Sequence, residues 1–270
     1  SFLLVLALFF GLLLLVFWVW VIPAVERIMA RKEQAERELT IARELQAKAL
    51  TQDFPHDPRC EVSAVLRAMK EVGGDIYRCR LIGRKLYFVV GDVSDKGTAA
   101  AFMMFLISST IQSRVAHGAP LAGLMDDING LLCDNPDYEM FCTLFLGAVD
   151  LDTLELEYCN AGHTRTLLDG AFLAQDPQLI VGIDSDFRYH TQRVQLKSGD
   201  RILVYTDGVT EARDENRAFF GEKRLRDWMQ ARPAEESCAG TCEALLDTIA
   251  RFRGKAPQND DIAVMCIKIL

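Results

Sequence analysis

The sequence has eight cysteines but no Cys-x-x-Cys pair, and it shows no internal repeat or low-complexity tract. Several of the cysteines fall in apolar, strand-like runs. This pattern favours buried, reduced thiols over disulfides or a zinc site.

Charge is absent from Phe2 to Ile22. At about 1.5 Å per residue, this run is long enough to cross a hydrocarbon core of about 30 Å, so it predicts a transmembrane helix over residues 1–23. A secretory signal peptide is the alternative, but no basic leading region or small-residue cleavage site accompanies the run. Four basic residues follow it closely and predict a cytoplasmic location for the rest of the chain: Arg27, Arg31, Lys32 and Arg37. Because the chain opens with Ser1, we expect that a sensor or further spans can precede it.

Glycine and proline are also absent from residues 24–54, which are charged and rich in good helix formers. We therefore expect a helical linker over residues 24–53. Small and apolar residues recur there at spacings of four and three, which is typical of a short coiled-coil seam: Ala35, Leu39, Ala42, Gln46 and Ala49. A solvated single helix is the alternative, since the seam is mostly alanine.

Residues 54–270 are long enough for one well-buried domain. Strands are expected at Ala64–Met69, Asp75–Ile82, Leu86–Val90, Phe141–Asp150, Leu154–Cys159, Thr164–Leu168, Val194–Leu196, Ile202–Tyr205 and Ile262–Leu270. Helices are expected at Ala99–Ala116, Leu121–Asn135, Gly221–Arg232 and Glu236–Phe252. Tight turns between consecutive strands imply antiparallel pairing, so the expected fold class is α+β, with two packed antiparallel sheets flanked by helices.

Acidic residues stand at the ends of four of these strands. Gly91 is expected to end the strand Leu86–Val90, which places Asp92 at its mouth, and Asp207 follows Tyr205 in the same way. Asp75 and the pair Asp260-Asp261 each open a strand. Gathered carboxylates repel one another, so a site that collects them needs cations, and hard divalent ions prefer oxygen donors.

The order of these acidic motifs resembles the SpoIIE-type bacterial branch of the PPM family, the metal-dependent serine/threonine protein phosphatases. The matching stretches are GGD at 73–75, GDVSDKG at 91–97, NAGH at 160–163, TDGVTE at 206–211, ARDEN at 212–216, FFG at 219–221 and NDD at 259–261. The resemblance covers residues 54–270. It implies the same two-sheet fold and phosphoserine or phosphothreonine hydrolysis.

The resemblance also implies a centre of two divalent cations, Mn²⁺ or Mg²⁺. Asp92 would bridge both ions and Asp75 would bind one, and both are therefore candidate catalytic residues. Asp207 and Asp260 would bind the other ion, and the carbonyl oxygen of Val93 would add a ligand. The choice between Asp260 and Asp261 stays open, because adjacent residues on a strand point to opposite faces.

One motif departs from the family pattern. Many PPM enzymes carry Gly-His-Gly where this chain has Asp95-Lys96-Gly97. Lys96 is a candidate for stabilising charge, but with an ordinary pKa of about 10.4 it is a poor proton donor near neutral pH. A loop cation without a catalytic role is the alternative.

A second phosphatase chemistry needs consideration. Cys159 and Arg165 match the Cys-x5-Arg loop of cysteine-dependent phosphatases, which requires a helix N-terminus to lower the pKa of the thiol and bind the anion. Here the residues after the loop are expected to continue as a strand, which provides no such dipole. This reading is therefore disfavoured.

The family suggests a phosphorylated anti-sigma-factor antagonist as substrate, at the cytoplasmic face of the bacterial inner membrane. We further expect membrane attachment through residues 2–22, a homodimer, regulation through the linker helix and no nucleic-acid partner. The competing function is a membrane-tethered signalling scaffold that binds a partner without turnover. All four acidic positions are present, so nothing in the sequence indicates loss of activity.

Overall fold

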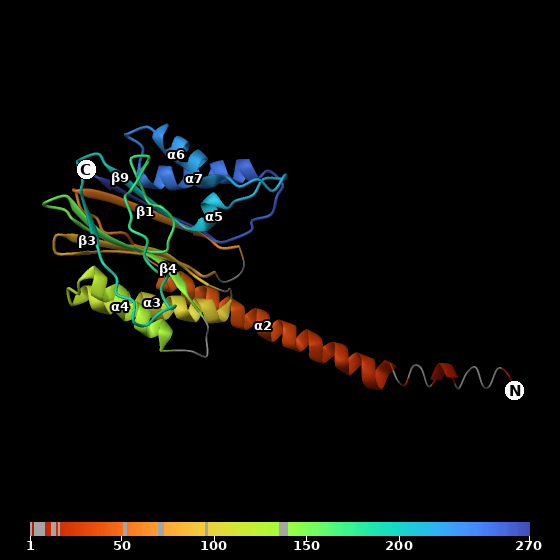
Figure 1. Ribbon diagram of the computed structural model, residues 1–270. Helices are drawn as coiled ribbons and strands as arrows, with labels where there is room; N and C mark the ends of the chain where they lie inside the picture. Colours follow the sequence, from red (N-terminus) through yellow and green to blue (C-terminus); the bar gives the residue numbers. More distant parts are fainter. Residues whose placement is uncertain are drawn as a thin grey trace. The chain divides into compact units, whose positions relative to one another are not determined.

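Two five-stranded antiparallel sheets pack face to face in the computed structural model (Figure 1), which describes residues 2, 9–11, 15, 17–50, 53–69, 73–94, 97–134 and 140–270. The first sheet has the order β1-β10-β9-β6-β7, formed by Cys60–Arg67, Ile262–Ile269, Arg201–Tyr205, Leu167–Leu168 and Ala171–Phe172. The second has the order β2-β3-β4-β5-β8, formed by Asp75–Ile82, Lys85–Val93, Cys142–Asp150, Glu155–Ala161 and Gln192–Gln195. The expected α+β class is confirmed.

Helices cover both outer faces of this sandwich (Figure 1). The outer face of the second sheet carries α3 (Thr98–Ala116) and α4 (Leu121–Cys133), and that of the first sheet carries α6 (Gly221–Gln230) and α7 (Cys238–Arg253). A short helix, α5 (Asp207–Thr210), follows β9. The alternation of side chains along each strand explains the layering: in β3, Phe88 and Val90 face the other sheet, while Val89 faces the helices.

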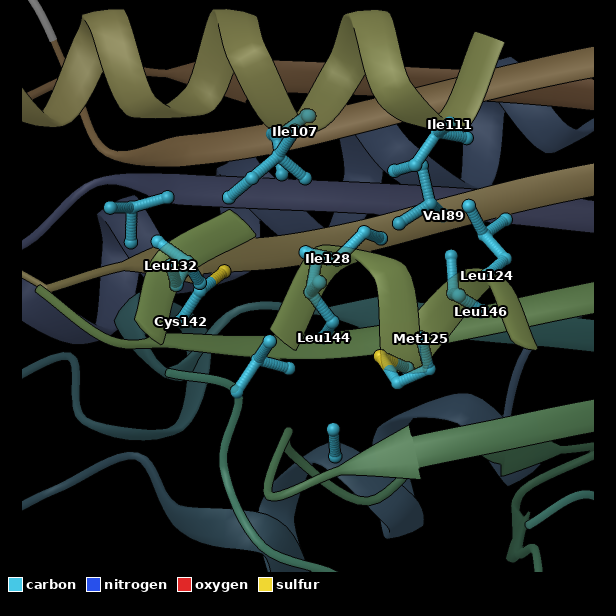
Figure 2. Close-up of a cluster of buried hydrophobic side chains, with 14 of the residues drawn as sticks. Val89, Ile107, Ile111, Leu124, Met125, Ile128, Leu132, Cys142, Leu144 and Leu146 are labelled. Atoms are coloured by element: carbon cyan, nitrogen blue, oxygen red, sulfur yellow. The ribbon is translucent and has the colours of Figure 1, made fainter. Parts of the chain in front are cut away.

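The core beneath α3 and α4 is shown in Figure 2. Ile107 and Ile111 of α3 descend toward Val89 of β3, and α4 contributes a row of apolar side chains. That row is Leu124, Met125, Ile128 and Leu132. This packing determines where α3 lies, and α3 begins six residues after Asp92.

The N-terminal part of the chain is helical where it is described. A π-helical turn, Phe17–Val21, leads into α2 (Ile22–Ala49), in which Arg37 pairs with Glu33 one turn earlier at 2.5 Å. The chain divides into two units at Glu44–Leu45. About half of the expected transmembrane run lies outside the described residues, as do the side chains of the expected coiled-coil seam, so both remain predictions.

Among the described residues, one stretch is long and apolar enough to cross a membrane, Ala99–Ala116. It belongs to α3, whose Met104, Ile107 and Ile111 are buried in the core. A helix that covers a sheet is apolar for this reason, so the stretch is part of the folded domain.

Several expected element boundaries were wrong. The strand expected over Thr164–Leu168 shortens to Leu167–Leu168, because the Thr164 hydroxyl donates to the carbonyl oxygen of Tyr205, and the Asn160 amide donates to the Thr164 carbonyl oxygen. The expected Ala64–Met69 strand runs from Cys60 to Arg67, since it pairs along the whole of β10. The strand β7 and the helix α5 were not expected.

Gly91 does not end its strand. It lies inside β3, where a Cβ atom would come 2.7 Å from the carbonyl oxygen of Thr143 and would overlap the Leu144 side chain. The glycine therefore permits close packing within the sheet. Asp92 consequently remains in the strand, paired on both sides, rather than at a free mouth.

The aromatic core between the sheets offers a test of this architecture. Phe145 is 1% exposed and stacks between Phe88 and Tyr158 at centroid distances of 5.9 and 5.8 Å. Phe145→Ala should lower the free energy of unfolding by about 3–5 kcal/mol. The exposed Phe102 is the control, and Phe102→Ala should change it by less than about 0.5 kcal/mol. Equal losses in urea unfolding of the two variants would contradict the assigned core.

Candidate metal centre at the ends of the two sheets

The register of one hairpin brings the first two acidic residues together. β2 and β3 pair so that Asp75 lies directly opposite Asp92, and Asp92 in turn lies opposite Thr143 of β4. Opposite residues in an antiparallel pair have Cβ atoms about 4.5–5.5 Å apart. The hairpin therefore fixes half of the predicted set by backbone pairing alone.

The other half comes from the first sheet. Asp207 begins α5 directly after β9, and Asp260 precedes β10, the neighbouring strand. The backbone N–H of Thr206 donates to the carbonyl oxygen of Ala263 at 3.0 Å, which holds these two chain segments side by side. Four strand ends thus converge at one edge of the sandwich.

Thr206 connects the two sheets. Its hydroxyl donates to Oδ2 of Asp75 at 2.7 Å and accepts from the backbone N–H of Ala263 at 2.9 Å, and the residue is completely buried. No role for Thr206 was predicted from the sequence. A small polar side chain at the end of an otherwise apolar strand, immediately before Asp-Gly, was the available signal.

The acidic side chains strongly influence one another. Burial and the charge of Asp92 raise the pKa of Asp75 well above its usual value. Burial, together with the charges of Asp207 and Asp260, raises the pKa of Asp92 to about 7. These carboxylates form a region of negative potential that favours a bound cation.

The donor set fits hard divalent ions, because it is made of carboxylate oxygens. In the described part of the chain, no three Asp, Glu, His or Cys side chains already surround a single point closely enough to hold an ion. Like charges hold carboxylates apart, and a divalent ion supplies the attraction that closes such a site.

Two members of the predicted set are less defined. The backbone N–H of Val93 donates to the carbonyl oxygen of Gly74 at 3.3 Å, so Val93 lies beside the acidic residues, although nothing tests its carbonyl as a ligand. Lys96 lies outside the described residues, and its assignment stays a prediction.

Asp261 differs from Asp260 in its surroundings. Oδ1 of Asp261 accepts from the backbone N–H of Met69 at 2.7 Å, and Oδ2 accepts from that of Gly74 at 3.0 Å. Asp261 is 3% exposed, whereas Asp260 is half-buried. Asp260 is therefore the better candidate for an ion ligand, and its assignment stays a prediction.

The cysteine-phosphatase alternative is not supported by the structure. Cys159 lies within β5 and is 1% exposed, and burial raises the pKa of its thiol to about 12. Arg165 instead lies over the ring of Phe172 and pairs with Glu222 at 3.5 Å. No helix starts between these two residues, so neither a thiolate nor a phosphate cradle forms there.

The NAGH motif forms a buried corner. A hydrogen bond of 2.9 Å joins Nδ1 of His163 and the Thr143 hydroxyl. The backbone N–H of His163 donates to the side-chain oxygen of Asn160 at 2.7 Å. Burial lowers the pKa of His163 to about 3, so the ring is neutral. Gly162, with φ of 66°, makes the turn. The motif therefore supports β4 at Thr143, the residue paired with Asp92.

This architecture is that of the PP2C phosphatase domains. The SiaA-PP2C domain of Pseudomonas aeruginosa aligns with a TM-score of 0.77 and 21% identity, covering 89% of this chain and 99% of that one. The PP2C domain with a regulatory fragment of SpoIIE from Bacillus subtilis aligns at 0.69 and 22% identity, covering 78% and 62%.

The family model described as Stage II sporulation protein E (SpoIIE) matches residues 82–270, and the chain belongs to this family. Protein IcfG of Synechocystis sp. is 28% identical over 228 residues, covering 72% of this chain and 36% of that protein. Phosphoserine phosphatase RsbU of Bacillus subtilis is 27% identical over 190 residues, covering 68% and 57%. The chain thus spans between a third and three fifths of the length of these relatives.

The repulsion among the acidic residues predicts a pH effect on stability without metal. The pKa of Asp92 rises from 3.8 to about 7 on folding, so the folded state binds the proton more tightly. Stability should therefore fall as pH rises from about 4 to 7 and stay low above that. In EDTA at pH 8, Asp92→Asn should melt several degrees above the unaltered chain, and the gap should close near pH 4. The exposed Asp247→Asn is the control and should show no such gap. A lower melting temperature for Asp92→Asn at pH 8 would contradict the proposed repulsion.

Proposed function

We propose that this chain is a metal-dependent phosphatase that hydrolyses phosphoserine or phosphothreonine on a partner protein. The observation that carries the proposal is the pairing of the buried Asp75 carboxyl group with the partly buried Asp92 carboxyl group, with Asp207 and Asp260 adding to their negative potential. Membership of the SpoIIE family supports it, as does the similarity to RsbU, a phosphoserine phosphatase.

The residues divide the work by position. Asp92 lies opposite Asp75 in the sheet, and the charges of Asp207 and Asp260 raise its pKa, so we assign Asp92 as the residue that would bind both ions. Asp75 would bind one ion, and Asp207 and Asp260 the other, with the carbonyl oxygen of Val93 as an additional donor. Thr206 orients Asp75 through its hydroxyl. When bound, Mn²⁺ or Mg²⁺ would neutralise the phosphoryl oxygens and make a water molecule a better nucleophile.

The remaining parts of the proposal concern context. Lys96 would stabilise negative charge near the phosphate. Residues 2–22 would anchor the chain in the bacterial inner membrane, with the phosphatase domain in the cytoplasm and the chain as a homodimer. A phosphorylated anti-sigma-factor antagonist would be the substrate.

Activity should depend on the acidic residues and not on a thiol. With Mn²⁺ and p-nitrophenyl phosphate, Asp92→Asn should lower kcat/KM by about a hundredfold or more, since it removes the charge proposed to bridge the ions. Cys159→Ser should keep most of the activity. EDTA-resistant turnover that is lost in Cys159→Ser would overturn the metal mechanism. Complete inactivity with every divalent metal would favour the scaffold.

The linker helix should control activity through the geometry of the site. Asp92 is six residues before α3, and two-metal catalysis tolerates little displacement of its ligands. Replacing residues 1–44 with parallel coiled coils in seven successive heptad phases should give Mn²⁺-dependent activities that vary with phase. Phase-independent activity, equal to that of residues 45–270 alone, would leave the helix as a passive tether.

A further inference from the structure

We propose that Asp261 is a positioning residue that holds the turn presenting Asp75, while its neighbour Asp260 serves the ion. This inference rests on the proposed metal site. Both oxygens of Asp261 are engaged by backbone donors, Oδ1 by the N–H of Met69 and Oδ2 by the N–H of Gly74. Its carboxylate therefore bridges the segment that follows β1 and the turn that precedes β2.

The glycines around Asp261 show how closely the backbone approaches it. A Cβ atom on Gly73 would lie 2.7 Å from Cγ of Asp261 and would overlap Oδ2. A Cβ atom on Gly208 would lie 2.9 Å from the carbonyl carbon of Asp261 and would overlap its oxygen. Real Cβ contacts do not approach this closely, so Gly73 and Gly208 are required for packing against this one residue.

The two backbone segments that pack against Asp261 each adjoin a predicted ligand, Asp75 or Asp207. Asp75 immediately follows Gly74, and the carbonyl oxygen of Gly74 accepts from the backbone N–H of Val93 at 3.3 Å. Gly208 follows Asp207. Asp261 thus fixes the backbone next to Asp75 and Asp207, while the Thr206 hydroxyl holds the Asp75 side chain. Hydrogen bonds from backbone N–H groups to a buried carboxylate are charge-assisted and strong, which suits this role.

The adjacent residues Asp260 and Asp261 can divide these roles because their side chains have different surroundings just before β10. Oδ1 of Asp260 accepts the backbone N–H of Asp261 at 2.8 Å and is oriented by it. An ion ligand needs a reachable oxygen, and Asp260 is half-buried. Asp261, at 3% exposure, is enclosed by backbone.

The first test compares the proposed positioning residue, Asp261, with the proposed ion ligands, Asp92 and Asp260, by melting temperature in EDTA and by Mn²⁺ calorimetry. Asp261→Asn leaves one of two buried N–H donors without an acceptor, so it should melt below the unaltered chain, opposite in sign to Asp92→Asn. It should bind as many Mn²⁺ ions as the unaltered chain, about tenfold to a hundredfold more weakly. Asp260→Asn should lose one Mn²⁺.

Two results would overturn the inference. If Asp261→Asn melts higher in EDTA and loses one Mn²⁺ ion, Asp261 is a ligand. If it melts lower but binds Mn²⁺ with unchanged affinity, Asp261 is structural only and does not position the site. An unaltered chain that binds no Mn²⁺ would instead refute the proposed function, and would be recognised before any variant is compared.

A second test probes the clamp from its other side without changing a carboxylate. Gly73→Ala should lower the melting temperature and weaken Mn²⁺ binding, because the new methyl group displaces Asp261. In an Asp261→Ala background, the same change should cost much less, since the obstructing oxygens are gone. Gly123→Ala is the matched control: nothing lies within 4 Å of its Cβ position on α4, so its effect should be the same in both backgrounds. Additive effects of Gly73→Ala and Asp261→Ala would contradict the clamp.

Discussion

Like charges held close together in a poorly solvated place are the constraint on which this structure depends. The pairing of β2 with β3 places Asp75, which is buried, opposite Asp92, which is partly buried. Such an arrangement costs free energy in the folded state unless protons or cations compensate it. In this fold the unfavourable repulsion occurs where the ends of four strands meet. A functional site differs in this respect from the rest of a protein core, where uncompensated charges are avoided.

The surrounding layers hold this arrangement in place. The inter-sheet core of stacked aromatic rings joins the two sheets, and the Thr206 hydroxyl then links the first sheet to Asp75 on the second. The helices α3 and α4 pack on the outer face of β3 and β4. The position of Asp92 therefore depends on packing on both sides of its strand.

Residues that look alike as candidates in the sequence have different surroundings in this molecule. Asp260 and Asp261 are adjacent, but one is half-buried at the site and the other is enclosed by backbone N–H groups. Cys159 and Arg165 match a catalytic loop by spacing, yet one is buried in a strand and the other covers a phenylalanine ring. Spacing along a sequence identifies candidates, and the local environment decides which of them can react.

The sequence by itself determined the fold class, the acidic residues near the ends of four strands and the strand Asp75–Ile82, because these depend on local periodicity and turn residues. It also indicated that the Cys159 loop lacks a helix. Tertiary structure decided what depends on contacts between distant segments. Gly91 continues its strand because Thr143 and Leu144 pack against it, and Thr164 leaves its strand because its hydroxyl donates to the Tyr205 carbonyl oxygen. Asp261 is enclosed because the backbone N–H groups of Met69 and Gly74 reach it from the segment between β1 and β2. Residues nearly two hundred positions apart come together only when the sheets assemble, so no local pattern records which of two adjacent aspartates faces the site.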